Sequence, residues 1–233
     1  MRSALVVPAA GRGDRLGLGR PKALVDLAGR PLLVHALERA RASGVVDVVV
    51  VVAPPAGCEV VRSALAGLDL PDLRVVEGGR ERQDSVRAGL VALPDDVDVV
   101  LVHDAARCLT PPGVFTAVVA AVRAGAVAVV PVLPVSDTVK RVAGDVVVET
   151  VDRRELAAVQ TPQGFAPGPL LRAHEAAAGA APATDDAGML EALGHPVRTV
   201  PGDDLAFKVT RPLDLVLAEA VLAGGPVPAR AAR

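Results

Sequence analysis

The sequence contains almost no aromatic side chains. Its 233 residues include three Phe, no Trp and no Tyr, although 51% of them are hydrophobic. A hydrophobic core of this composition must be built mainly from Val, Leu and Ala. The length corresponds to one medium-sized domain, so we expect a single domain over 1–233 that ends in a flexible Gly/Pro/Ala/Arg-rich tail at 224–233.

Cysteine is scarce, and neither sign of charge dominates. Cys58 and Cys108 are far apart, and neither has a second Cys or a His at the spacing of metal ligands, which argues against a disulfide scaffold or a zinc site. The formal net charge is −2. The chain therefore lacks the overall basic field that nonspecific nucleic-acid binding requires, and we expect no nucleic-acid partner.

Long uninterrupted hydrophobic runs are also missing, although the mean hydropathy is +0.42. The longest uncharged stretches are 48–58, 108–122 and 124–136, and each contains proline. None reaches the roughly 20 apolar residues of a membrane-spanning helix. The N-terminal apolar run at 4–7, which is followed at once by Pro8, is too short and ends too abruptly to be a signal peptide, so we expect a cytoplasmic protein with no membrane partner.

Short Val-rich runs alternate with segments of helical periodicity. The runs are continuously apolar, which is typical of strands buried on both faces. The expected strands are 4–7, 45–52, 73–76, 97–102 and 126–132, and the expected helices between them are 31–43, 59–66, 84–93 and 111–123. This alternation predicts an α/β fold with a Rossmann-like, mostly parallel sheet flanked by helices.

The alternation breaks after Val132. The extended segments 138–142 and 146–151 flank Gly144-Asp145, a pair typical of a hairpin turn. We therefore expect a β-hairpin arm, within 136–154, that projects from the sheet. Helical periodicity returns at 169–178, 185–193 and 212–223, with a short strand expected at 197–200.

The loop after the first expected strand is the first candidate for ligand binding, because ligands of parallel sheets bind beyond the carboxyl ends of the strands. Gly11 and Gly13 allow backbone N–H groups to converge on an anion, and Arg15 and Lys22 add two positive charges. The dinucleotide fingerprint is excluded because Leu16 replaces its third glycine, and no Walker A pattern is present. The loop predicts phosphate binding; a surface loop with solvated charges is the alternative.

Glycines and polar residues also follow the third expected strand. Gly78 and Gly79 permit close approach of the backbone to a ligand. Asp84 or Ser85 could cap the helix that follows and direct its N–H groups toward a ligand. An ordinary turn and helix cap is the alternative interpretation.

The fourth expected strand is followed by His103, which we interpret as a hydrogen-bonded structural residue. The next carboxylate, Asp104, suits Mg²⁺ or a ligand hydroxyl, and Arg107 suits a phosphate. A plain turn is the alternative for Asp104. The remaining histidines, to which we assign no role because no partner is evident, are His35, His174 and His195.

The chain shows no nucleophilic Ser or Cys with a positioned His, and no HExxH motif. A phosphate nucleophile is already ionised at neutral pH and needs no general base. A reaction at phosphorus can therefore depend on cations and positioning alone. The residues that suit this class are Arg15, Lys22, Asp104, Arg153 and Lys208.

Nine motifs, in order from about 4 to 222, together resemble the 2-C-methyl-D-erythritol 4-phosphate cytidylyltransferase family. They are Pro8-Ala9-Ala10-Gly11-x-Gly13-x-Arg15, Pro21-Lys22, Gly78-Gly79 with Asp84-Ser85-Val86, His103-Asp104-Ala105-Ala106-Arg107, Asp137-Thr138-x-Lys140, Asp152-Arg153, Thr161-Pro162-Gln163, Thr184-Asp185-Asp186 and Lys208-x-Thr210-Arg211-Pro212. The resemblance implies the nucleotide-diphospho-sugar transferase fold. It also implies transfer of CMP from CTP to methylerythritol 4-phosphate, with release of pyrophosphate, in the non-mevalonate route to isoprenoids.

The resemblance further implies a role for each matching residue. Arg15 and Lys22 would stabilise charge on the α-phosphate and the leaving pyrophosphate, while Arg153 and Lys208 would position the substrate phosphate. The implied substrate-binding residues are Asp104, Arg107, Thr138 and Thr161, and the implied nucleotide-binding residues are Ala9, Ala10, Gly11, Gly13, Gly79, Asp84, Ser85 and Ala105. Mg²⁺ would arrive mainly with the triphosphate, with Asp104 as a possible protein ligand.

The arm would exchange across a homodimer, so that Thr138 and Arg153 serve the neighbouring subunit's site. Two positions depart from the family pattern: Ala206 replaces a common Asn, and Cys108 replaces a usual Pro. Two other functions stay open. One is a cytidylyltransferase for another alditol phosphate, such as ribitol 5-phosphate, and the other is a non-catalytic nucleotide-binding protein.

Overall fold

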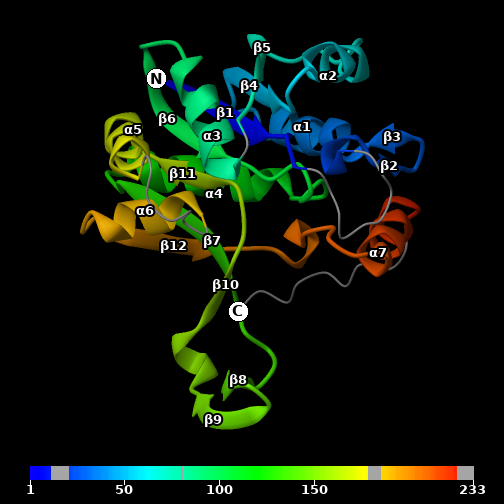
Figure 1. The fold of residues 1–233 in the computed structure, drawn as a ribbon. Helices are drawn as coiled ribbons and strands as arrows, with labels where there is room; N and C mark the ends of the chain where they lie inside the picture. Colours follow the sequence, from blue (N-terminus) through cyan, green and yellow to red (C-terminus); the bar gives the residue numbers. More distant parts are fainter. Residues whose placement is uncertain (12–20, 80, 178–184, 225–233) are drawn as a thin grey trace.

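The computed structural model describes residues 1–11, 21–79, 81–177 and 185–224. Within these residues, one sheet contains eight strands in the order β10-β7-β11-β6-β1-β4-β5, with β12 beside β7 (Figure 1). The strands are β1 (Arg2–Pro8), β4 (Val48–Ala53), β5 (Leu73–Glu77), β6 (Val97–Val102), β7 (Ala128–Pro134), β10 (Ala157–Val159), β11 (Gln163–Phe165) and β12 (Val197–Pro201). Only β10 and β11 pair antiparallel to their neighbours among these strands. The prediction of a mostly parallel α/β sheet is confirmed.

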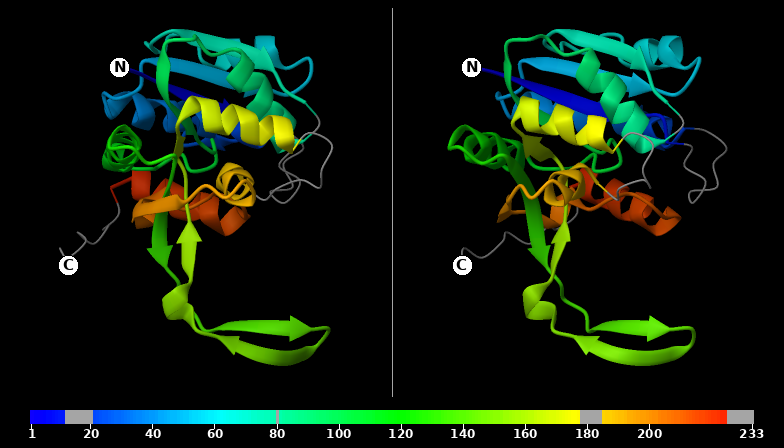
Figure 2. Two further views of the ribbon diagram at one scale, coloured as in Figure 1. Left: turned by 90° about the vertical axis from the view of Figure 1, so that its left-hand side faces the viewer. Right: turned by 60° about the vertical axis from the view of Figure 1, so that its left-hand side comes forward.

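Helices cover both faces of this sheet (Figure 2). Leu5 and Val7 of β1 point into one hydrophobic layer and Ala4 and Val6 into the other, and all four are fully buried. The first layer contains α1 (Leu32–Ala42), α2 (Cys58–Ala64) and α4 (Pro112–Arg123), and the second contains α3 (Arg82–Val91), α5 (Pro167–Ala176) and α6 (Asp186–Ala192). Burial on both faces explains why the strands are continuously apolar.

A third, smaller cluster joins the C-terminal part of the chain to the N-terminal part. Ala218 of α7 (Pro212–Leu222) packs there with Leu27, at the end of β2 (Asp26–Leu27), which pairs with β3 (Arg30–Pro31). Cys108 is buried in the same cluster, and both cysteines are free thiols. Cys108 is therefore an apolar residue of this core. In the described part of the chain, no helix is both long and apolar enough to cross a membrane.

The order of the strands creates a switch point between β1 and β6. From β1 the chain runs outward through β4 to β5 and then returns to β6 on the other side of β1. The carboxyl ends of β1 and β6 therefore open a crevice, the usual ligand site of such sheets. Ala9 and Asp104 follow these two strands, so the topology brings the first and fourth predicted loops together.

The expected hairpin is present as β8 (Val139–Ala143) and β9 (Val146–Val151), a separate two-stranded sheet that projects from the body (Figures 1 and 2). Gly144 at its turn has a φ of +61°, which favours glycine. The 3-10 helix η3 (Arg153–Glu155) follows the arm. Of the predicted tail, residues 225–233 lie outside the described residues.

The start of α3 corrects one prediction. The helix begins at Arg82 after Glu81, so neither Asp84 nor Ser85 is its N-cap. Asp84 still takes part in capping, because it is the third helical residue of a capping box and its carboxylate accepts the backbone N–H of Glu81 at 3.2 Å. The Ser85 hydroxyl donates to the Glu81 carbonyl at 3.1 Å. Both side chains stabilise the first turn from within the helix.

Candidate active site

Two adjoining clefts open at the switch point. The first, the β1 cleft, has a volume of about 190 Å³. Its lining consists largely of small residues and is made of Pro8, Ala9, Ala10, Gly11, Lys22, Ala23, Glu81, Arg82, Ser85, Asp104, Ala105, Ala106 and Lys208. Because the apolar residues of this lining are all small, a ligand can lie against the backbone there.

The second, the β11 cleft, has a volume of about 450 Å³ and a more polar wall. It is lined by Arg82, Asp104, Arg107, Val130, Val159, Gln160, Thr161, Gln163, Asp185, Ala187, Glu191, Val197 and Lys208. Arg82, Asp104 and Lys208 line both clefts. These three charged residues therefore form a shared wall, and a group bound on one side lies next to a group bound on the other.

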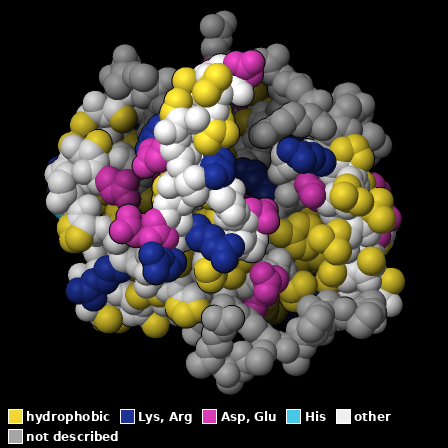
Figure 3. Space-filling model, turned by 90° about the horizontal axis from the view of Figure 1, so that it is seen from below, with side chains coloured by type: hydrophobic (Ala, Val, Ile, Leu, Met, Phe, Trp, Pro, Cys, Tyr) yellow, Lys and Arg dark blue, Asp and Glu magenta, His cyan; other side chains and the backbone are white. Residues whose placement is uncertain are grey.

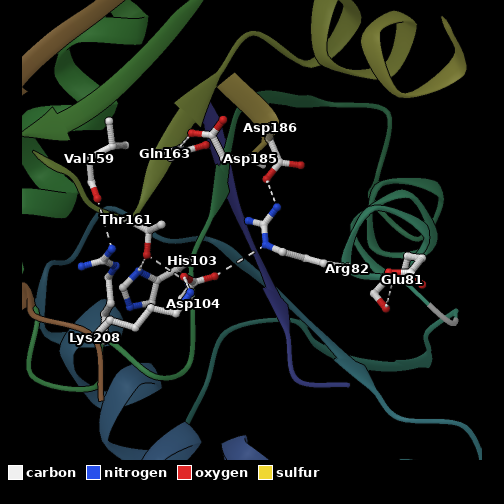
Figure 4. Close-up of polar contacts among 12 residues, drawn as sticks. Glu81, Arg82, His103, Asp104, Val159, Thr161, Gln163, Asp185, Asp186 and Lys208 are labelled. Carbon is white, nitrogen blue, oxygen red and sulfur yellow. Dashed lines mark hydrogen bonds and ion pairs between the residues drawn. The ribbon is translucent and has the colours of Figure 1, made fainter. Parts of the chain in front are cut away.

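Asp104 is the centre of the shared wall (Figure 4). Its side chain is 14% exposed, its Oδ2 accepts from Lys208 Nζ at 2.7 Å, and its Oδ1 lies 3.7 Å from Arg82 Nε. Burial alone would raise the pKa of Asp104, but the charges of Lys208 and Arg82 lower it to about 2. Asp104 is therefore a carboxylate at neutral pH and can accept a hydrogen bond from a ligand hydroxyl.

The backbone at Asp104 is fixed by Thr161 and His103. The Asp104 N–H donates to Thr161 Oγ1 at 3.0 Å, and the same oxygen lies 2.9 Å from His103 Nδ1. His103 is fully buried against Phe115, with 5.0 Å between the ring centroids. The interpretation of His103 as a structural residue is confirmed by this burial and hydrogen bonding, and burial lowers its pKa to about 4.

We expect His103 to make the protein less stable in mild acid. Its pKa is about 4 in the folded state and 6.5 unperturbed, so the unfolded chain takes up a proton first as the pH falls through this window. The free energy of unfolding should then decrease by up to about 3 kcal/mol between pH 6.5 and 4. In denaturant titrations, the free energy of unfolding of His103→Asn should decrease less over this pH range, because Asn keeps a polar side chain but does not titrate. Parallel profiles for the two proteins would contradict the assignment.

Arg107 lies on the β11 cleft, but two of its donors are already used. Nη1 donates to the Ala206 carbonyl at 2.7 Å and Nη2 to the Val159 carbonyl at 3.1 Å. These two hydrogen bonds connect β10 to the segment before Lys208, and Arg107 also lines the cleft. Because Ala206 contributes its backbone carbonyl and is fully buried, this contact does not depend on the Asn side chain that is common at that position in the family pattern.

Six of the predicted residues line the β1 cleft in addition to Asp104 and Lys208. They are Ala9, Ala10, Gly11, Lys22, Ser85 and Ala105. The Ala9 N–H donates to the Val52 carbonyl at 2.8 Å, so it belongs to the sheet and is not offered to a ligand. The Lys22 N–H donates to the Gly11 carbonyl at 3.0 Å, which holds the two ends of the first loop together at the cleft.

Arg107 and Thr161 line the β11 cleft, and the other predicted residues that the structure describes lie in neither cleft. Gly79 lies at the start of α3, where an added Cβ would be 2.3 Å from Asp84 Cβ, so packing against the helix requires glycine there. Asp84 is exposed on the same turn. Thr138 and Arg153 are exposed on and beside the arm, where Arg153 Nη1 donates to the Ser136 carbonyl. Three of the named positions lie outside the described residues: Gly13, Arg15 and Thr184.

Sequence reasoning missed a buried network beside the shared wall. Arg82 Nη1 lies 2.8 Å from Asp186 Oδ2, and Asp186 Oδ1 accepts from His174 Nε2 at 3.0 Å. The expectation that His174 has no partner is wrong. Arg82 begins α3 three residues after the Gly78-Gly79 pair, and this pair was the available signal. Asp186 belongs to the Thr184-Asp185-Asp186 motif, but its burial could not be predicted from the sequence.

The clefts offer little to a metal ion by themselves. In the part of the chain that the structure describes, no group of three or more His, Cys, Asp or Glu side chains could hold a metal. Asp104 is the carboxylate common to both clefts, and both of its oxygens face cations. This donor set fits Mg²⁺ only in the mode in which substrate phosphates and water supply most of the ligands.

Comparison with known proteins finds relatives over nearly the whole chain. The family model of 2-C-methyl-D-erythritol 4-phosphate cytidylyltransferase matches residues 3–224. Proteins of that name from Streptomyces avermitilis and Nocardia farcinica are 56% and 57% identical to this chain; the alignments cover 95% and 93% of it, and 92% of each relative. The crystal structure of the enzyme of that name from Thermus thermophilus has a TM-score of 0.76 and 38% identity, with 96% of this chain and all of that chain covered.

Proposed function

The chain belongs to the 2-C-methyl-D-erythritol 4-phosphate cytidylyltransferase family, and from this premise we propose how its two clefts divide the reaction. The protein transfers CMP from CTP to 2-C-methyl-D-erythritol 4-phosphate in isoprenoid biosynthesis. CTP binds in the β1 cleft and the alditol phosphate in the β11 cleft. The observation that carries this assignment is the Lys208 and Asp104 ion pair on the wall that the clefts share.

The β1 cleft suits a nucleotide that is held without aromatic stacking. Ala9, Ala10, Gly11 and Ala105 leave the floor of the cleft open, and a Cβ added to Gly11 would meet no heavy atom of the described residues within 4 Å. The cytosine is held by backbone groups and small side chains. Lys22 enters the cleft from the carboxyl side of the first loop and stabilises the negative charge of the phosphates.

The chemical step is an in-line displacement at the α-phosphorus. An oxygen of the alditol phosphate attacks it, the bond to the bridging oxygen of the β-phosphate breaks, and pyrophosphate leaves with that electron pair. No proton has to be removed from the nucleophile. Lys208 orients the attacking phosphate, Asp104 and Thr161 bind the alditol, and Lys22 stabilises the charge that develops on the leaving group.

We propose that Mg²⁺ accompanies the triphosphate and that Asp104 is the protein residue that would ligate it. When bound, the ion neutralises part of the triphosphate charge. The protein works in the cytoplasm in this proposal, because CTP is an intracellular metabolite. The proposal for Mg²⁺ rests on the triphosphate and on the single carboxylate that the two clefts share. The proposal for the cytoplasm rests on the substrate alone.

A homodimer formed through the arm is the second part of the proposal. An isolated two-stranded hairpin is only marginally stable in water, yet Val142, Val146, Val147 and Val148 expose 54–60% of their surface. Figure 3 views this side of the molecule and shows exposed hydrophobic side chains together with Lys and Arg. A second copy would cover the valines and bring Arg153 and Thr138 to the neighbouring clefts.

Pyrophosphate release tests the assignment of the substrate. With CTP and Mg²⁺, the protein should release pyrophosphate rapidly with 2-C-methyl-D-erythritol 4-phosphate and at least about a hundredfold more slowly, by kcat/KM, with ribitol 5-phosphate. Equal rates would mean that the β11 cleft does not select the branched alditol. Binding of CTP without turnover of either alditol would indicate a nucleotide-binding protein instead.

A further inference from the structure

A buried carboxylate lies behind the shared wall and takes no direct part in the reaction described above. Asp186, the first residue of α6, is fully buried. Burying a charge is costly unless it is paired and hydrogen-bonded. Asp186 has both kinds of partner: Arg82 as an ion pair at 2.8 Å and His174 as a hydrogen-bond donor at 3.0 Å. Burial alone would raise the pKa of Asp186, but these partners lower it.

Arg82 connects this buried pair to the active site (Figure 4). Its guanidinium is 34% exposed, with Nη1 on Asp186 at 2.8 Å and Nε at the longer distance of 3.7 Å from Asp104 Oδ1. Two carboxylates therefore compete for one guanidinium, and the buried one holds it more closely. The two positive charges of Arg82 and Lys208 are therefore matched by the two negative charges of Asp104 and Asp186.

We infer that Asp186, oriented by His174, is a positioning residue that holds the Arg82 guanidinium back from Asp104. With Asp186 in place, Asp104 Oδ1 remains open to a hydroxyl of the alditol. Without that anion, Asp104 is the remaining carboxylate within 4 Å of Arg82 among the described residues. A short guanidinium and carboxylate pair would then occupy the oxygen that the substrate needs.

The hydrogen bond from His174 fits this role. His174 is fully buried on α5, and its Nε2 donates to Asp186 Oδ1 while its Nδ1 has no hydrogen-bond partner within the described chain. A neutral imidazole with its proton on Nε2 satisfies this arrangement. The hydrogen bond uses Oδ1 of Asp186 and leaves Oδ2 facing Arg82. The three residues thus connect α5 and α6 to the first turn of α3.

The inference rests on the proposed placement of the alditol at Asp104, so the experiment begins with that residue. Steady-state kinetics should give Asp104→Asn a KM for methylerythritol phosphate about tenfold or more above the parent value. If that KM does not change, the placement of the substrate is wrong, independently of Asp186. Glu175→Gln, an exposed carboxylate beside His174, and Arg87→Gln, an exposed cation on α3, are the matched controls and should behave as the parent protein.

Asp186→Asn tests the inference itself. We expect the KM for the alditol phosphate to rise about tenfold, with the KM for CTP within about twofold of the parent value. His174→Gln, which retains a donor, should stay near the parent value, whereas His174→Phe should shift in the direction of Asp186→Asn. A general structural lesion would instead change both KM values and kcat, and that result would overturn the positioning role.

A double-mutant cycle separates action through Asp104 from any other effect. In the Asp104→Asn background, Asp186→Asn should change the KM for the alditol by less than about twofold, because the group it protects is already absent. Independent, multiplicative effects would overturn the inference. If Asp186→Asn does not fold, His174→Phe takes its place in the same cycle, with the same expected results. A rise in the KM for CTP that persists in the Asp104→Asn background would show that the network acts on the nucleotide, and would overturn the inference too.

Discussion

Lys22→Ala is expected to lower kcat by about three powers of ten while leaving the fold intact. Lys22 lines the β1 cleft where the triphosphate is proposed to bind. Loss of a cation that stabilises the charge of the transition state corresponds to about 4 kcal/mol of activation free energy. The fold should tolerate the change because the local backbone bond, from the Lys22 N–H to the Gly11 carbonyl, does not involve the side chain.

The measurement compares turnover with stability. The kcat for pyrophosphate release and the free energy of unfolding in denaturant are determined for Lys22→Ala and for Arg41→Ala, a surface cation on α1 whose ion pair with Asp69 is 2.9 Å long. The control should retain parent turnover. Near-normal turnover of Lys22→Ala would show that the leaving group lies elsewhere. By family resemblance, Arg15→Ala should show a similar loss, although position 15 lies outside the described residues.

The sheet could be predicted where local composition decides the structure. Strands β6 and β9 occupy the predicted ranges, because continuous apolar residues or a Gly-Asp turn define them locally. The short strands β10 and β11, of three residues each, were not predicted. Their pairing depends on β6 and β7, which lie well before them in the chain, and so on the completed topology.

The candidate site was predictable as a set of loops but not as a set of contacts. Asp104 and Lys208 were both predicted, and they meet at 2.7 Å across 104 residues of sequence. Gly79 was singled out for close approach to a ligand, but the close approach is to α3. Asp186 was named only as part of the Thr184-Asp185-Asp186 motif, with no role of its own. Its burial follows from how α5 and α6 pack on the sheet, which no local pattern encodes.

The arm leads to the second prediction with a large effect. Arg153 lies beside the arm and outside both clefts of its own chain. If it serves the partner subunit, each site needs Lys22 from one chain and Arg153 of the partner subunit. Homodimers of Arg153→Ala and of Lys22→Ala should then each lose about three powers of ten in turnover.

Mixing these two inactive proteins should restore activity. In a mixed dimer, the chain that carries Arg153→Ala keeps its own Lys22 and receives an intact arginine from its partner, so one of the two sites is complete. Random exchange makes half of the dimers mixed, and about a quarter of all sites should then regain parent activity. Sites built within single chains would stay inactive in every combination, because each chain lacks one of the two cations. Activity that remains at the level of the homodimers, in mixed dimers isolated with two different tags, would therefore exclude sharing of the arm.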